Sequence, residues 1–271
     1  MNEVQKVVFD MFEHFADVCN RLGLKYYLVN GSALGSKKYG GFIAWDDDMD
    51  VAMPREDYEV FLSKAQELLP EEIFVQNYRT DPAFPFMYTK LRNSNTTFIE
   101  ASVEKLNINH GIYLDLFPLD GYEDESGISS RIKKIKIKIL HWFHFCALDD
   151  KSSFKIRIRN FVLRVFGFHK RTAKSLEKLE RIVSNSENDS KYLCNYSDRQ
   201  GKGCILREWY GKGSVSKFEG AEVIIPENFE SYFTKKYGDW REELPENEQK
   251  SHHKAYICDV TKSYTEYINN Q

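Results

Sequence analysis

The chain has 271 residues, a hydrophobic fraction of 42% and a formal net charge of -3. This composition excludes an intrinsically disordered protein, and the length suits one sizeable catalytic core with an extension. No apolar run approaches the roughly 20 residues of a membrane-spanning helix. The N-terminus, MNEVQKVVFDMFEHF, carries acidic residues and does not resemble a signal peptide.

The five cysteines are scattered, and no two of them stand at C-x-x-C spacing. We therefore expect neither a disulfide framework nor a structural zinc site. Together with the absence of a leader pattern, this favours a cytoplasmic location.

The first 70 residues predict alternating helices and strands. Apolar residues at three- and four-residue steps predict an amphipathic helix from Val4 to Leu22, ended by Gly23. The elements expected next are a strand at 26–29, a short helix at 33–36 opened by Gly31 and Ser32, a strand at 42–51 and a helix at 55–69 stopped by Pro70.

Further strands are expected at 73–78, 87–92, 96–101 and 112–117, with Pro118 ending the last. This order predicts an α+β or α/β fold with a mixed sheet flanked by helices, in which the strand at 42–51 lies near the centre. Helices follow at 128–146, 154–168 and 176–183. We expect a catalytic core over 1–125, a basic helical segment over 126–190 and a C-terminal part over 191–271 that completes the substrate site.

The sequence WDDDMDV at 45–51 is the main candidate for chemistry. In an extended segment Asp46, Asp48 and Asp50 would share one face, and three like charges on one face need a cation. Carboxylate oxygens suit Mg²⁺ or Mn²⁺. An EF-hand is disfavoured because Val51 stands where that loop needs glycine, and a merely solvated loop is disfavoured because apolar residues alternate with the aspartates.

Other candidate residues surround this cluster. The Gly31-Ser32 turn could bind phosphate oxygens at a helix N-terminus. Asp115, a charge inside an apolar strand, is a candidate metal ligand, general base or partner of a core Lys or Arg. Lys90 and Arg92 share a strand face and either bind a diphosphate or are solvent-exposed. We expect Asp120 in a turn, Arg55 paired with Asp47 or Asp57, and His252 and His253 as either ligands or ordinary histidines.

Three segments resemble the motifs of the LicD family: NGSALGSKKYGGFIAWDDDMDVAMPREDYEVF, HGIYLDLFPLDG and FTKKYGDWREELPENEQKSHH. Lys38 stands where the family mostly has Arg, and Ala44 replaces a Pro. The resemblance implies a nucleotidyltransferase-like core that transfers a phospho-alcohol, most often phosphocholine from CDP-choline, to a cell-surface glycan. Asp48 and Asp50 would hold the metal with Asp46 beside them, Asp115 would assist, and Gly31, Ser32, Lys38, Lys90 and Arg92 would contact the donor.

The implied partners are a CDP-alcohol donor and a saccharide acceptor, free or lipid-linked. Transfer of glycerol or ribitol phosphate, nucleotidyl transfer with release of pyrophosphate, and a non-catalytic binding module are the alternatives. Residues 131–181 carry 15 Lys or Arg against 4 Asp or Glu. That excess suits either an anionic membrane surface or a solvated helical face. No nucleic-acid partner is expected.

Overall fold

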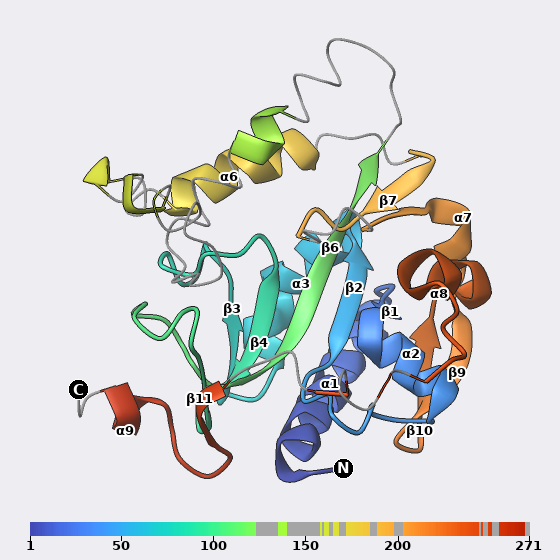
Figure 1. Cartoon of the computed structure of the whole chain (residues 1–271), viewed down its shortest axis with the longest axis horizontal. Coiled ribbons are helices and arrows are strands. Elements are labelled where there is room, and N and C mark those ends of the chain that lie inside the picture. The colour runs from blue at the N-terminus through green and yellow to red at the C-terminus, as the bar shows by residue number, and fades with distance from the viewer. Residues whose placement is uncertain are drawn as a thin grey trace.

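Figure 1 shows the computed structural model of the chain, in which helices surround a twisted sheet. The structure describes residues 1–122, 135–139, 158, 160–162, 165–167, 172–184, 189–197, 203–243, 245, 249–250 and 255–268. His252, His253 and most of the helices expected at 128–146 and 154–168 lie outside these residues. The division into three parts stays a prediction.

The chain begins with α1 (Glu3–Leu22), which confirms the first predicted helix. Asn2 starts it with a capping box, in which its side chain and that of Gln5 each accept a hydrogen bond from the other residue's amide at 2.8 Å. Gly23 ends it with φ of 67°, a left-handed conformation that glycine adopts without steric cost.

Among the described residues the main sheet has seven strands, in the order β1-β2-β6-β4-β3, and β7 and β8 extend it from one end of β6. Its strands are β1 (Tyr27–Leu28), β2 (Asp50–Pro54), β3 (Ile73–Gln76), β4 (Thr89–Asn93), β6 (Ile112–Tyr122), β7 (Tyr192–Cys194) and β8 (Cys204–Leu206). Only β2 and β6 run parallel among these pairs. The sheet is therefore mixed, and the predicted α+β fold is confirmed.

Two smaller sheets and the remaining helices complete the described structure (Figure 1). The small sheets pair β5 (Thr97–Glu100) with β11 (Ala255–Asp259), and β9 (Ser214–Phe218) with β10 (Ala221–Ile225). The helices are α2 (Asn30–Lys38), α3 (Arg55–Leu68), α6 (Thr172–Val183), α7 (Arg207–Tyr210), α8 (Phe229–Tyr237) and α9 (Thr265–Ile268). None of the described helices has the length and apolar character to cross a bilayer.

The main core lies between the sheet and the helices α1 and α3. Phe15 of α1 and Phe61 of α3 are fully buried, and their ring centroids lie 5.1 Å apart. Leu114 and Leu116 of β6 belong to the same cluster. Burial of each such side chain contributes about 1.5–3 kcal/mol, so this layer fixes β2 and β6, the two strands on which the site depends.

The strand predicted at 42–51 is mostly a loop, and β2 begins only at Asp50. The loop's backbone groups find partners outside any ladder. The amide of Phe42 donates to the Glu219 carboxylate at 3.1 Å, and the carbonyl of Asp46 accepts from Gln5 at 2.7 Å. Alternating apolar and acidic residues therefore mimicked a strand where the chain instead packs against α1 and the β9–β10 turn.

The prediction that Pro118 ends a strand is also wrong, because β6 continues to Tyr122. The Asp115 amide donates towards β2, to Met49, and alternation along the strand turns the nitrogen of residue 118 to the opposite side. On that side, the pairing of β6 with β4 stops at Leu116, and its pairing with β7 starts only at Asp120. Proline therefore removes no ladder hydrogen bond there.

Asp120 is not a turn residue, and Arg55 pairs with neither Asp47 nor Asp57. Asp120 lies in β6 with 1% exposure, and its two carboxylate oxygens accept hydrogen bonds from the Arg55 guanidinium at 2.7 and 2.8 Å. The bidentate pair joins the start of α3 to the sheet.

Cys194 and Cys204 face each other across β7 and β8 and form a disulfide. The expectation of no disulfide is wrong for this pair. The two residues are separated by 10 positions, a spacing that reveals nothing until the strands pair. The cytoplasmic location, which rested partly on the cysteines, stays a prediction.

Candidate functional site

Three aspartates converge where β2 and β6 lie side by side. The parallel register places Asp50, the first residue of β2, opposite Asp115 of β6. Asp48 stands two residues before Asp50 and therefore points to the same side. One carboxylate oxygen from each of Asp48, Asp50 and Asp115 lies within 4.8 Å of the others, an arrangement that could hold a metal ion.

Desolvation is the largest influence on the protonation of Asp50. Burial raises the pKa of Asp50 well above its ordinary value, and the charges of Asp48, Asp115 and Asp46 raise it further. A side-chain hydrogen bond from Asn30 opposes the rise. A bound cation would relieve this repulsion, so the donor set fits a hard divalent ion.

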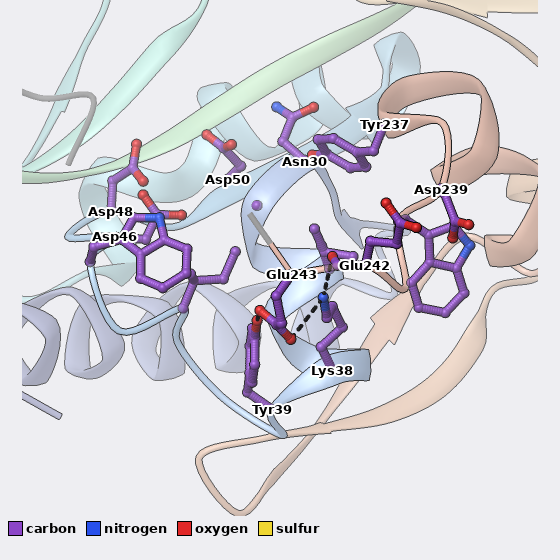
Figure 2. A pocket seen from close by; sticks show the side chains of 15 residues that line it. Asn30, Lys38, Tyr39, Asp46, Asp48, Asp50, Tyr237, Asp239, Glu242 and Glu243 are labelled. Atoms are coloured by element: carbon purple, nitrogen blue, oxygen red, sulfur yellow. Dashed lines mark hydrogen bonds and ion pairs between the residues drawn. The ribbon is translucent and has the colours of Figure 1, made fainter. Parts of the chain in front are cut away.

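The cluster opens into a pocket of about 350 Å³, which Figure 2 shows from close by. Asp46, Asp48 and Asp50 line it, and Asp46 lies outside the trio that converges with Asp115. A Cβ atom on Gly31 would come within 2.6 Å of an Asp46 carboxylate oxygen. Glycine at this position therefore allows Asp46 to approach the first turn of α2.

Ser32 and Lys38, both predicted to contact the donor, already have partners within the protein. The Ser32 hydroxyl accepts a hydrogen bond from the Asp50 amide at 2.8 Å, so it ties α2 to the first residue of β2. Gly31 lines the pocket, whereas Ser32 is buried beneath it. Lys38 also lines the pocket, and its ammonium lies 3.1 Å from Glu243.

Lys90 lies beside the aspartate cluster, and Arg92 lies deeper. Both are almost fully buried, so their alternative as solvent-exposed charges is wrong. The Lys90 ammonium is 3.0 Å from a carboxylate oxygen of Asp115 and 3.0 Å from the ring centroid of Tyr113. Asp115 thus combines two of its candidate roles, as a member of the cluster and as the partner of a core lysine.

Arg92 donates to the side chain of Gln76 at 2.8 Å and to the carbonyl of Gly111 at 2.7 Å. It does not line the pocket. The geometry brings Gly31, Lys38, Asp46, Asp48 and Asp50 to one cavity, with Asp115 and Lys90 at its edge, and leaves Arg92 in the core.

Two residues of the site escaped the sequence analysis. Asn30 has φ of 48°, and besides its bond to Asp50 its side-chain oxygen accepts from the ammonium of Lys236 at 2.5 Å. Asn is one of the few residues that adopt this conformation readily, so an Asn before the Gly-Ser turn was a usable signal. Lys236 lies in the third segment that resembles the LicD motifs.

The aromatic residues near the C-terminus divide into two groups. Tyr210, Tyr232 and Phe233 are buried in the core. Tyr237 and Trp240 line the pocket, so these two of the described C-terminal aromatic residues are placed to meet a substrate.

Comparison with known proteins agrees with the motifs. Residues 23–149 match the family described as LicD/FKTN/FKRP, nucleotidyltransferase domain. The lipopolysaccharide cholinephosphotransferase LicD of Haemophilus influenzae is 25% identical over 268 residues, which cover 95% of this chain and 98% of that protein. The matched segment contains every member of the aspartate cluster. Over residues 23–149, the chain is therefore similar to the LicD/FKTN/FKRP family.

Proposed function

We propose that this protein is a metal-dependent transferase that moves phosphocholine from CDP-choline to a hydroxyl of a cell-surface glycan or its lipid-linked precursor, with release of CMP. The observation that carries the proposal is the convergence of Asp48, Asp50 and Asp115, the first two of which line the pocket, in a chain that is 25% identical to a cholinephosphotransferase. The location that suits a lipid-linked acceptor is the inner face of the cell membrane.

Charge balance supports a divalent ion. Asp48, Asp50 and Asp115 converge, and Lys90, which lies 3.0 Å from Asp115 and 3.7 Å from Glu100, offsets at most one of their negative charges, so the cluster favours a divalent cation such as Mg²⁺ or Mn²⁺. Asp48 and Asp50 would hold the ion, with Asp46 beside them as an outer or alternate ligand, and Asp115 would either ligate the ion or take the proton of the acceptor hydroxyl. Such an ion supplies charge stabilisation for the phosphoryl group during in-line displacement.

The protein's own groups would position the donor and accept the proton of the acceptor hydroxyl. The acceptor oxygen forms a new bond to the phosphorus that bears choline, and the bond from that phosphorus to the CMP oxygen breaks. The hydroxyl proton passes to a carboxylate of the site, for which Asp115 is the candidate. Gly31 at the start of α2 would supply an amide to the donor phosphates, and Lys38 would contribute its positive charge from beside Glu243.

The test is release of CMP from CDP-choline, CDP-glycerol or CDP-ribitol in the presence of an acceptor glycan and Mg²⁺. Asp48→Asn should reduce kcat at least a hundredfold, because one metal ligand is lost, while the melting temperature should not fall, because the substitution also removes repulsion between Asp48 and Asp50. Asp47→Asn is the matched control, since Asp47 is the neighbouring carboxylate and does not line the pocket.

The products separate the alternatives. Release of pyrophosphate in place of CMP would indicate nucleotidyl transfer. Release of CMP only from CDP-glycerol or CDP-ribitol would show that the transferred group is glycerol or ribitol phosphate, not phosphocholine. The absence of any nucleotide product with all three donors would contradict transferase function and favour a binding module.

A further inference from the structure

The pocket has a second wall that the metal chemistry does not use. It lies away from the aspartate cluster, and Figure 2 shows Tyr237, Asp239 and Glu242 on the opposite side of the cavity from Asp46 and Asp48. We call it the acid–aromatic wall, and its residues are Tyr39, Tyr237, Asp239, Trp240 and Glu242.

The carboxylates of this wall exceed the cations beside them. Glu243 is paired with Lys38, and hydrogen bonds from Tyr39 and Lys38 lower the pKa of Glu243 below its usual value. In the part of the chain that the structure describes, no salt bridge joins Asp239 or Glu242 to a cation. Asp239 and Glu242, both exposed, thus add negative charge to the wall, while the guanidinium of Arg241 pairs with Glu230 and lies 4.3 Å from the Trp240 ring centroid.

The wall already accommodates one ammonium group. The Lys38 ammonium lies 5.6 Å from the ring centroid of Tyr39 and donates to the carbonyl oxygen of Glu242 at 2.9 Å. Both the ring and the carbonyl belong to residues of the wall. The same surface thus stabilises positive charge through ring faces and oxygen atoms together.

We infer that the acid–aromatic wall is the subsite for the cationic head of the transferred alcohol, an assignment that rests on the proposed function. A quaternary ammonium has no N–H to donate, so ring faces and nearby carboxylates are the groups that can bind it. The donor's phosphates would lie at the aspartate end with the metal, and the ammonium at the opposite end. A neutral polyol gains nothing from the charge of this wall.

The decisive probe is the CDP ester of 3,3-dimethylbutanol, which replaces the trimethylammonium nitrogen of choline by carbon and keeps its shape. The wild type should prefer CDP-choline by about tenfold or more in kcat/KM, since cation–π and carboxylate contacts act only on the charged head. The double variant D239N/E242Q should lose most of this preference and keep its activity on the neutral ester.

Two matched variants separate the contributions. Tyr237→Phe keeps the ring and should retain the preference, whereas Tyr237→Leu should reduce it. Glu67→Gln, on the exposed side of α3, removes a carboxylate that does not line the pocket, and it should leave kcat/KM for both esters unchanged. Equal use of the two esters by the wild type, or an equal loss for both esters in D239N/E242Q, would overturn the assignment.

Calorimetric binding of the two esters with Mg²⁺ keeps this inference distinct from the proposed function. If no donor releases CMP, the transferase proposal fails. Tighter binding of CDP-choline than of the neutral ester, lost in D239N/E242Q, would still support the cationic subsite, and equal affinities would refute it.

Discussion

Gly31 and Gly35 of α2 both stand where a methyl group would meet an oxygen atom, yet the two contacts differ in kind. At Gly31 the oxygen belongs to the movable side chain of Asp46, 2.6 Å from the added Cβ. At Gly35 it is the backbone oxygen of Gly41, at 2.5 Å. A side chain can rotate away, whereas a backbone must shift.

Gly31→Ala should therefore impair activity more than stability. We expect the free energy of unfolding to fall by less than about 1 kcal/mol, while kcat falls because Asp46 is displaced from the pocket. Gly35→Ala should lower the free energy of unfolding by about 1–3 kcal/mol. Denaturant unfolding and CMP release, measured on both variants, check this. An equal loss of stability in the two would contradict the distinction.

The ammonium of Lys90 lies 3.0 Å from a carboxylate oxygen of Asp115. Lys90→Met would leave the buried carboxylates without their internal counter-charge, so we expect unfolding in EDTA to become easier by about 3–5 kcal/mol. Mg²⁺ should restore more stability to this variant than to the wild type, because it replaces the lost charge. Denaturant titrations with and without Mg²⁺ measure both effects, with the exposed Lys64→Met as control. A deficit that is identical in the two conditions would show that Lys90 does not balance the metal site.

For single residues, the sequence showed which charged side chains are unusual better than it showed what they contact. Asp115 stood out because a carboxylate in an apolar strand needs a partner, and both a lysine and a carboxylate cluster surround it. Lys90 and Arg92 were indistinguishable in sequence, since both alternate on one strand. Only the register of β4 against β6, which puts Lys90 opposite Asp115, separates their environments.

At the scale of elements, α6 is held to the core by a network of charges. Glu180 of α6 accepts hydrogen bonds from Arg55 at 2.8 Å, from Arg79 at 2.7 Å and from the Tyr78 hydroxyl. Arg55 in turn holds Asp120 of β6. One carboxylate therefore links α6 to the start of α3 and to the residues after β3.

Glu180→Gln should loosen α6. It removes the charge that two guanidinium groups share, so we expect a loss of about 2 kcal/mol in the free energy of unfolding. Hydrogen exchange should accelerate in α6 before it does in β6. Glu177→Gln, in the same helix, breaks an exposed pair with Arg181 and should cost at most about 0.5 kcal/mol. Equal rates of hydrogen exchange in α6 of the two variants would show that Glu180 does not anchor this helix.

Elements with a strong apolar period were predictable, and elements defined by their neighbours were not. The helix predicted from Val4 matches α1 because both its caps are local. The loop at 42–49 and the passage of β6 through Pro118 depend on segments distant in sequence. Local patterns carry no information on which side of a strand lacks a partner.

For the whole molecule, membrane contact stays open to a direct test. Phe161 and Phe166 are 68% and 70% exposed, in a stretch with a large excess of Lys and Arg. Basic residues near anionic lipid contribute about 1 kcal/mol each, so the full chain should sediment with phosphatidylserine-containing vesicles and dissociate at high salt. Vesicles of phosphatidylcholine alone are the control. Equal recovery with both lipids, or none with either, would favour the solvated helical face.

One rung of the sheet has a wider consequence. Tyr122, the last residue of β6, pairs directly with Tyr192, the first of β7. The residues between them, which include α6, therefore start and end in two paired neighbouring strands. Lengthening a loop whose two ends are held together costs little conformational entropy, since the closure penalty grows only with the logarithm of the loop length. Relatives could therefore exchange this stretch, and with it whatever it docks to, without moving a single aspartate of the pocket.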